Sequence, residues 1–141
     1  MKKMCKAISL ILVFALCLAV PVSAEEVAPY ASNYFMAHRA YLESISGSSF
    51  KVWFNVTSVS TMTTLGVNYI EIEESSDGVN WSPVKTYDKS DYSQLTANNV
   101  YYHSGYVTFN NKQSGYQYRA YVDFYAKNSS GSATYGTYAY F

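Results

Sequence analysis

Two glutamates in an alternating segment are the arrangement in this sequence best suited to acid–base chemistry. Glu71 and Glu73 are two residues apart, which on a strand places their side chains on one face, about 7 Å apart. Two carboxylates at such a separation are the pair that an inverting glycosidase uses. However, nothing nearby in the sequence distinguishes an acid from a base, and a solvated strand face explains both residues. We therefore expect no enzyme activity.

Metal-binding and nucleophilic residues are sparse. The only histidines are His38 and His103, and both cysteines lie within the first 24 residues, so a transition metal would need carboxylate ligands. No serine lies in the glycine pattern of a nucleophile elbow. Four other oxygen-bearing side chains lack the alternating spacing of a calcium loop: Asp77, Asn80, Asp88 and Asp91. We expect no catalytic residue, no metal and no cofactor.

Aromatic residues are the outlier in composition, because all 16 tyrosines and both tryptophans follow residue 24. Trp53, Tyr69, Tyr121 and Tyr125 fall on the outward parity of their predicted strands. Exposed rings on a rigid sheet offer contact area at low entropic cost to a sugar or to a protein partner. The same rings could instead stabilise cross-strand pairs without binding anything. These four residues are the candidate binding surface.

The elements that would position these rings are strands. In residues 115–128 the even-numbered positions from Tyr116 to Ala126 are all apolar or aromatic, while most odd positions are polar. This is the period-two pattern of a strand with one buried face. We predict that this stretch is the long central strand of the domain.

Six further segments carry strand signals, at residues 32–44, 50–57, 67–74, 81–87, 101–110 and 133–141. The first could also be an amphipathic helix, but its aromatic content and the turn at Gly47 favour a strand. Residues 57–64, rich in Ser and Thr, are predicted to be a connection, and residues 88–99 a loop with at most one short edge strand. About seven strands and no convincing helix predict an all-β fold, a single antiparallel β-sandwich.

The first 24 residues have the form of a secretory signal peptide. Three lysines precede an apolar run over residues 8–20, and Val22-Ser23-Ala24 supplies the small residues of a cleavage site. The run is shorter than the roughly 20 residues of a membrane-spanning helix, which disfavours a retained anchor. We expect a secreted, extracellular mature chain with a flexible leader over residues 25–31 and one domain over residues 32–141.

Cleavage of this signal would change both the cysteine content and the charge. It would leave no cysteine, so the domain would be free of disulfides and would depend on its hydrophobic core. It would leave seven basic residues against ten acidic ones, a net charge of −3. Such a chain lacks the basic footprint of a nucleic-acid-binding protein and a polybasic membrane patch. We expect no nucleic-acid partner and no membrane association after cleavage.

Three features occur together after residue 68: Ile70-Glu71-Ile72, the turn Ser76-Asp77-Gly78, and Trp81 in the following hairpin. With them, residues 69–141 resemble an immunoglobulin-like sandwich of the fibronectin type III kind, in which Tyr116 or Tyr118 would be the corner tyrosine. Trp53 would stand for the family's early tryptophan, although its outward parity departs from the pattern. By fold analogy alone, the loops at 77–80 and 127–132 are a second candidate surface.

The whole chain also resembles a group of short secreted proteins of Gram-positive bacteria that is known only as a domain of unknown function. This resemblance implies a fold and a compartment but no activity. The sequence predicts a secreted adhesion or recognition module that binds a glycan or a protein through its tyrosine-rich surface. The alternatives are a small antimicrobial or toxin-like protein, and a structural component of a surface assembly that associates through an edge strand such as residues 133–141.

Overall fold

The structure of this chain is a computed structural model that describes residues 33–141. Its six strands are β1 (Phe35–Ser46), β2 (Ser49–Ser75), β3 (Ser82–Asp88), β4 (Thr96–Phe109), β5 (Gln117–Asn128) and β6 (Gly131–Tyr140). One short 3-10 helix, η1 (Ser93–Leu95), precedes β4. All strand pairs are antiparallel, so the predicted all-β, antiparallel class is confirmed. The predicted signal peptide and leader lie outside the described residues.

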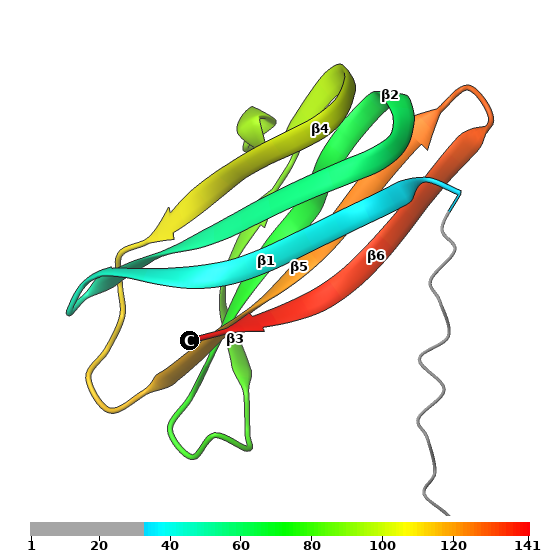
Figure 1. The fold of residues 1–141 in the computed structure, drawn as a ribbon. Helices are drawn as coiled ribbons and strands as arrows, with labels where there is room; N and C mark the ends of the chain where they lie inside the picture. Colours follow the sequence, from blue (N-terminus) through cyan, green and yellow to red (C-terminus); the bar gives the residue numbers. More distant parts are fainter. Residues whose placement is uncertain (1–32) are drawn as a thin grey trace, which may run out of the picture. The chain divides into compact units, whose positions relative to one another are not determined.

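Strand β2 is the common partner of the sheet, because it pairs with β1, β3, β4 and β5, while β6 pairs with β5. Its first half, residues 50–57, lies between β1 and β4. Its second half, residues 69–75, lies between β3 and β5. Figure 1 shows β2 bending at its middle, so the sheet curls and its two halves face each other.

The prediction of a connection at residues 57–64 is wrong, because these residues belong to β2, a single strand of 27 residues. Two predicted strands are therefore one, and the predicted count of about seven is too high by one. Ser and Thr suit a strand when their hydroxyls have partners. The hydroxyl of buried Ser58 lies within hydrogen-bond distance of two backbone carbonyl oxygens, those of Ser60 and Tyr101, and can donate to either. Between the pairs Thr57–Tyr102 and Met62–Val100, β2 has more residues than β4 and so carries extra residues that β4 does not pair. These extra residues form the bend without ending the strand.

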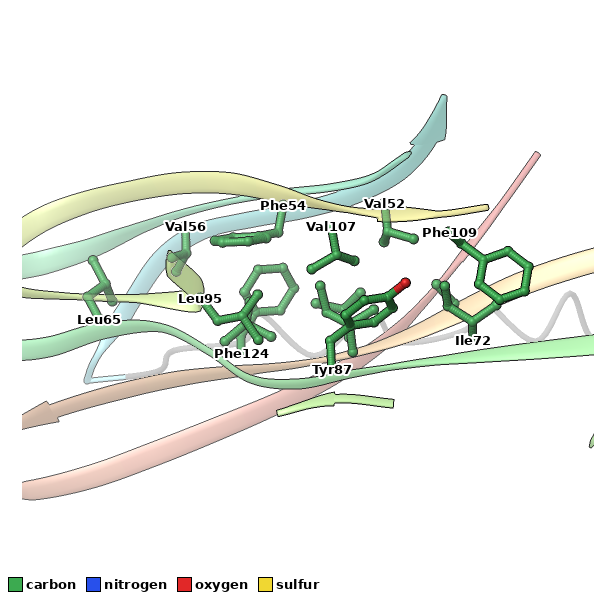
Figure 2. Packing of buried hydrophobic residues seen from close by; sticks show 14 of the residues in the cluster. Val52, Phe54, Val56, Leu65, Ile72, Tyr87, Leu95, Val107, Phe109 and Phe124 are labelled. Carbon is green, nitrogen blue, oxygen red and sulfur yellow. The ribbon is translucent and has the colours of Figure 1, made fainter. Parts of the chain in front are cut away.

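The core lies between the two halves of the sheet. Figure 2 shows Val52, Phe54 and Val107 on one side facing Phe124 and Ile72 on the other. Residues predicted to form the long central strand form β5, but the longest strand with the most partners is β2. The even-numbered residues of β5 from Tyr118 to Ala126 are all buried, as their parity predicts, whereas Tyr116 precedes the strand and is exposed. Every buried side-chain nitrogen or oxygen in the described residues has a hydrogen-bond partner. Because the core lies between the two halves, each half has one face packed against the core and one outer face.

Candidate functional site

The structure divides the four predicted binding residues between two outer faces. Trp53 lies on the first half of β2, whereas Tyr69 lies on the second half and Tyr121 and Tyr125 lie on β5 beside it. Because the two halves face each other across the core, their outer sides point away from each other (Figure 2). The four residues therefore do not form one surface.

Five tyrosines cover the outer side of the half formed by β2, β5 and β6, and we call them the tyrosine face: Tyr69, Tyr121, Tyr125, Tyr138 and Tyr140. The ring centroid of Tyr121 lies 5.9 Å from that of Tyr69 and 5.1 Å from that of Tyr138. The register explains the second contact, because Tyr121 and Tyr138 are directly opposite each other. Tyr138 is 40 % exposed and Tyr140 56 % exposed, so a ligand can reach these rings.

Arg119 joins the tyrosine face to the loop between β2 and β3. Its guanidinium carbon lies 4.4 Å from the ring centroid of Trp81 and 4.2 Å from that of Tyr138. It also forms an ion pair with Glu73, its register partner on β2. Partial burial opposes the charge, but the hydrogen bond with Glu73 raises the pKa of Arg119 above its ordinary value. The guanidinium is thus close enough to both rings for a cation–π contact with each.

Gly136 on β6 provides the space that the Tyr121 ring occupies. A Cβ atom at residue 136 would overlap the hydroxyl and ring of Tyr121. Residue 136 is opposite Asp123, two residues from Tyr121 on β5, so the Tyr121 side chain extends diagonally over the β6 backbone. An aromatic ring that covers a glycine in the neighbouring strand is a known way to stabilise a sheet.

A pocket of about 480 Å³ opens at the end of the sheet where β5 begins. Its walls are mostly aromatic and come from the β2–β3 loop, the β4–β5 loop, the start of β5 and the C-terminal end: Gly78, Trp81, Lys112, Tyr116, Gln117, Tyr118, Tyr140 and Phe141. We call it the end pocket. The Gln117 amide lies against Gly78, where an added Cβ would come within 3.0 Å of it. Lys112 places its ammonium 4.8 Å from the ring centroid of Phe141.

Asp77 builds the turn that carries Gly78 and Trp81 to the end pocket. Its Oδ1 accepts hydrogen bonds from the backbone N–H groups of Val79 and Asn80, each at 2.8 Å. These bonds, led by that of Asn80, lower the pKa of the Asp77 carboxyl far below its ordinary value. The other loop of the second candidate surface, residues 127–132, lies at the opposite end of β5. The two loops therefore do not form one surface.

Trp53 belongs to a row of three rings on the other outer face, the tryptophan ladder of Tyr41, Trp53 and Tyr106. The Trp53 centroid lies 6.3 Å from that of Tyr41 in a stacked arrangement and 4.6 Å from that of Tyr106. Its indole N–H donates a 2.6 Å hydrogen bond to Glu43. The Lys51 ammonium lies 4.2 Å from the Tyr106 centroid. The outward parity predicted for Trp53 is confirmed.

Glu71 and Glu73 share the outer face of β2, as predicted, but the other residues considered for catalysis and metal binding do not gather around them. Glu73 is engaged by Arg119, whereas Glu71 lies opposite Tyr121. Burial lowers the pKa of His38, whose ring lies 4.1 Å from that of Tyr135. A ring nitrogen of His103 lies 2.9 Å from the carbonyl oxygen of Gln94. Within residues 33–141, no group of three or more His, Cys, Asp and Glu side chains has the arrangement to hold a metal ion.

Sequence reasoning did not assign Tyr138, Tyr140, Trp81 or Arg119 to the binding surface, and it did not predict the end pocket. Tyrosines on β6 lie on both faces, since Tyr135 packs against the core while Tyr138 and Tyr140 point outward. Alternation separates Tyr138 and Tyr140 from Tyr135, but because both sets are aromatic it does not show which set points outward. Arg119 had a detectable signal, because it shares the outward parity of Tyr121 on β5.

No protein-family model matches this chain, and searches of curated proteins and of solved structures found no significant match. Among the described residues, no helix is long and apolar enough to span a membrane.

Proposed function

We propose that this protein is a secreted, non-catalytic recognition domain that binds a glycan through the tyrosine face and the end pocket. The observation that carries the proposal is the continuity of these two surfaces. Tyr140 belongs to the tyrosine face and also lines the end pocket. Trp81 lines the same pocket and contacts Arg119, which contacts Tyr138. A ligand could therefore lie along the rings and place one end in the pocket.

The chemistry of this combined surface suits a sugar chain. Flat rings supply contact area to the apolar faces of sugars without a large loss of side-chain entropy. The pocket volume of about 480 Å³ is within the range of ligand sites, which combine apolar walls with a few polar groups. Gln117 and Lys112 are the polar groups here. The ion pair of Arg119 and Glu73 holds the rings in place before a ligand arrives.

We also propose that the curled sheet is an immunoglobulin-like sandwich of the fibronectin type III kind. In that architecture strands A, B and E form one sheet and C, F and G the other. Here the order A–B–E corresponds to β1, the first half of β2, and β4. The order C–F–G corresponds to the second half of β2, β5 and β6, and β3 pairs with β2 where strand C′ would lie. Buried Tyr118 near the start of β5 accepts a 2.8 Å hydrogen bond from the backbone N–H of Gln113, five residues upstream. Such a bond is typical of a tyrosine corner, and Tyr116 is exposed.

Secretion remains part of the proposal and rests on the signal-like residues 1–24. A Gram-positive source and a place among secreted proteins of unknown function rest on resemblance alone. Localisation of the full-length chain in culture medium and in cells, with sequencing of the mature N-terminus, tests this part. Cleavage after residue 24 and recovery from the medium would support it, whereas retention of the intact chain in cells would refute it.

The binding proposal is tested by sedimentation of the purified domain with insoluble polysaccharides and with cell walls. Tyr121→Ala and Trp81→Ala each remove a ring from the combined surface, and we expect each to weaken binding roughly tenfold, which corresponds to about 1.4 kcal/mol. Tyr101→Ala is the matched control, because Tyr101 is 64 % exposed and lies on β4, away from the tyrosine face. Failure of the unaltered domain to bind any of these materials would refute the glycan proposal and leave a protein partner, toxicity or self-assembly as the role.

A further inference from the structure

The rings of the tyrosine face differ in whether a cation of the protein lies over them. The Lys89 ammonium lies 3.9 Å from the ring centroid of Tyr125, and the Arg119 guanidinium lies beside Tyr138. Within residues 33–141, no lysine or arginine lies over Tyr69 or Tyr121. The fold therefore places cations on two parts of this face, whereas the half-buried Tyr69 and Tyr121 have no cation of the protein over their rings.

Carboxylates surround this pair of tyrosines. The register places Asp88 of β3 on one side of Tyr69 and Asp123 of β5 on the other. Glu71 lies two residues further along β2, directly opposite Tyr121. Directly opposite side chains in a sheet have Cβ atoms roughly 5 Å apart. Rings and carboxylates therefore alternate on this part of the surface.

Among the described residues none of these three carboxylates forms an ion pair, although the charge of Lys89 acts on its neighbour Asp88. Asp123 accepts a 2.8 Å hydrogen bond from the Asn68 amide, and Asp88 accepts one of 2.8 Å from the backbone N–H of Ser90. The Lys89 ammonium donates a 2.6 Å hydrogen bond to the side-chain oxygen Oδ1 of Asn68. In the described part of the chain the one salt bridge is that of Arg119 with Glu73. The pair thus lies in a region of negative potential.

The hydroxyls of the pair respond to this potential. Burial, and then the neighbouring Tyr121, Asp123 and Glu71, raise the pKa of Tyr69. Burial, and then Asp123 and Tyr138, raise the pKa of Tyr121. Burial disfavours charge of either sign at the pair, whereas the repulsion by Asp123 and Glu71 acts against negative charge alone, so an acidic sugar is opposed by both effects.

We propose that Tyr69 and Tyr121, with Glu71, Asp88 and Asp123 around them, bind the ammonium group of an amino sugar, so that the preferred glycan carries free rather than acetylated amines. This inference rests on the proposed glycan-binding function. A cation over a tyrosine ring is attracted by the ring's negative face, and nearby carboxylates add Coulomb attraction. An N-acetylated sugar would keep the ring contacts but gain neither of these terms.

The tryptophan ladder has the opposite electrostatic character and supplies an internal comparison. Lys51 lies over Trp53 and Tyr106, and Arg39 lies over Tyr41. The carboxylate of that face, Glu43, accepts the hydrogen bond of the Trp53 indole. Glu43→Gln therefore removes the same charge as Glu71→Gln from a surface that does not offer an ammonium site.

The test compares binding of a soluble glucosamine oligosaccharide with that of its fully N-acetylated form, by titration calorimetry at low and high salt. For the unaltered domain we expect the glucosamine form to bind roughly tenfold more tightly at low salt, and this preference to shrink as salt screens the carboxylates. Glu71→Gln and Asp123→Asn should reduce the preference several-fold while binding of the acetylated form is unchanged. Glu43→Gln should leave both affinities unchanged. Thermal unfolding of each variant reports whether the domain is still folded.

Each other outcome counts against the proposal in a distinct way. Equal affinity for the two oligosaccharides, or a preference that survives in both carboxylate variants, would overturn the ammonium site while leaving the glycan-binding function intact. Loss of the preference in Glu43→Gln would mean that overall charge, and not this site, is responsible. If neither oligosaccharide nor any insoluble polysaccharide binds, the proposed function itself fails, and this inference fails with it.

Discussion

Gly136 is the residue that most directly controls the tyrosine face, because the Tyr121 ring occupies the space where its Cβ would be. We predict that Gly136→Ala displaces this ring and weakens glycan binding about as much as Tyr121→Ala does, with a loss of roughly 1 kcal/mol in the free energy of unfolding. Urea unfolding and the same sedimentation assay measure both quantities.

A double variant separates ring displacement from a general effect on β6. Once Tyr121 is alanine, the methyl group at residue 136 meets no ring, so the two changes should be strongly non-additive. We expect the double variant to be about as stable as Tyr121→Ala alone. Additive destabilisation would contradict this account of Gly136.

For single residues, the alternation in the sequence identified rings that point outward, but it did not show which of these rings lie on the same face of the molecule. Trp53 and Tyr69 are both odd-numbered residues of β2 and both point outward, so the sequence placed them on one surface. The bend between them separates them onto two faces. Alternation specifies the side of a strand on which a residue lies, whereas the direction of that side depends on curvature set by distant contacts.

At the scale of elements, Gly66 allows β2 and β4 to approach each other next to η1. Its φ is +153°, and an added Cβ would overlap the Leu95 carbonyl oxygen and lie 2.7 Å from the Thr96 Cα. We predict that Gly66→Ala lowers the free energy of unfolding by roughly 3 kcal/mol or more, because backbone atoms must move. Gly47→Ala, at the turn between β1 and β2, is the control, since no atom lies within 4 Å of the added carbon.

Urea unfolding of the two alanine variants gives the comparison. Gly47→Ala should change the free energy of unfolding by no more than about 0.5 kcal/mol. Equal stability of the two variants would show that the contact at residue 66 relaxes more easily than the structure suggests.

Pairing between distant strands explains why the predicted strand count was wrong. The sequence at residues 57–64 has the composition of a loop, and only its pairing with β4 and the buried Ser58 and Met62 make it part of a strand. Likewise, β4 begins at Thr96 inside the predicted loop because residues 96–98 pair with residues 64–66 of β2. Long-range pairing overrode local composition in both places.

At the scale of the whole molecule, Tyr87 links the edge strand β3 to β4 across the core. Its hydroxyl donates a 2.7 Å hydrogen bond to the Thr108 carbonyl oxygen. Burial, and then the neighbouring Tyr92, raise the pKa of Tyr87 to about 12, whereas an unfolded tyrosine titrates near about 10. Between these values the unfolded chain releases this proton while the folded domain keeps it. The free energy of unfolding should therefore be independent of this group below pH ~10 and fall as pH rises toward 12.

Tyr87→Phe should cost about 1 kcal/mol at neutral pH, because the Thr108 carbonyl loses its donor. It should also make the decline in stability above pH ~10 shallower. Urea unfolding at several alkaline pH values, with tyrosinate absorbance followed in parallel, measures both effects. Tyr101→Phe controls for the loss of a hydroxyl at an exposed position. An unchanged slope in Tyr87→Phe would exclude Tyr87 as a source of the alkaline instability.

The pairing of β2 with four of the other five strands also bears on how the domain responds to force and to proteolysis. A domain assembled from separate hairpins can lose one of them and keep the rest folded. Here melting of the first half of β2 removes the partner of β1 and β4, and melting of the second half removes that of β3 and β5. Because the two halves are one strand and share one core, we expect the loss of either half to destabilise the other. We therefore expect cooperative, all-or-none unfolding and few protease-sensitive partly folded states.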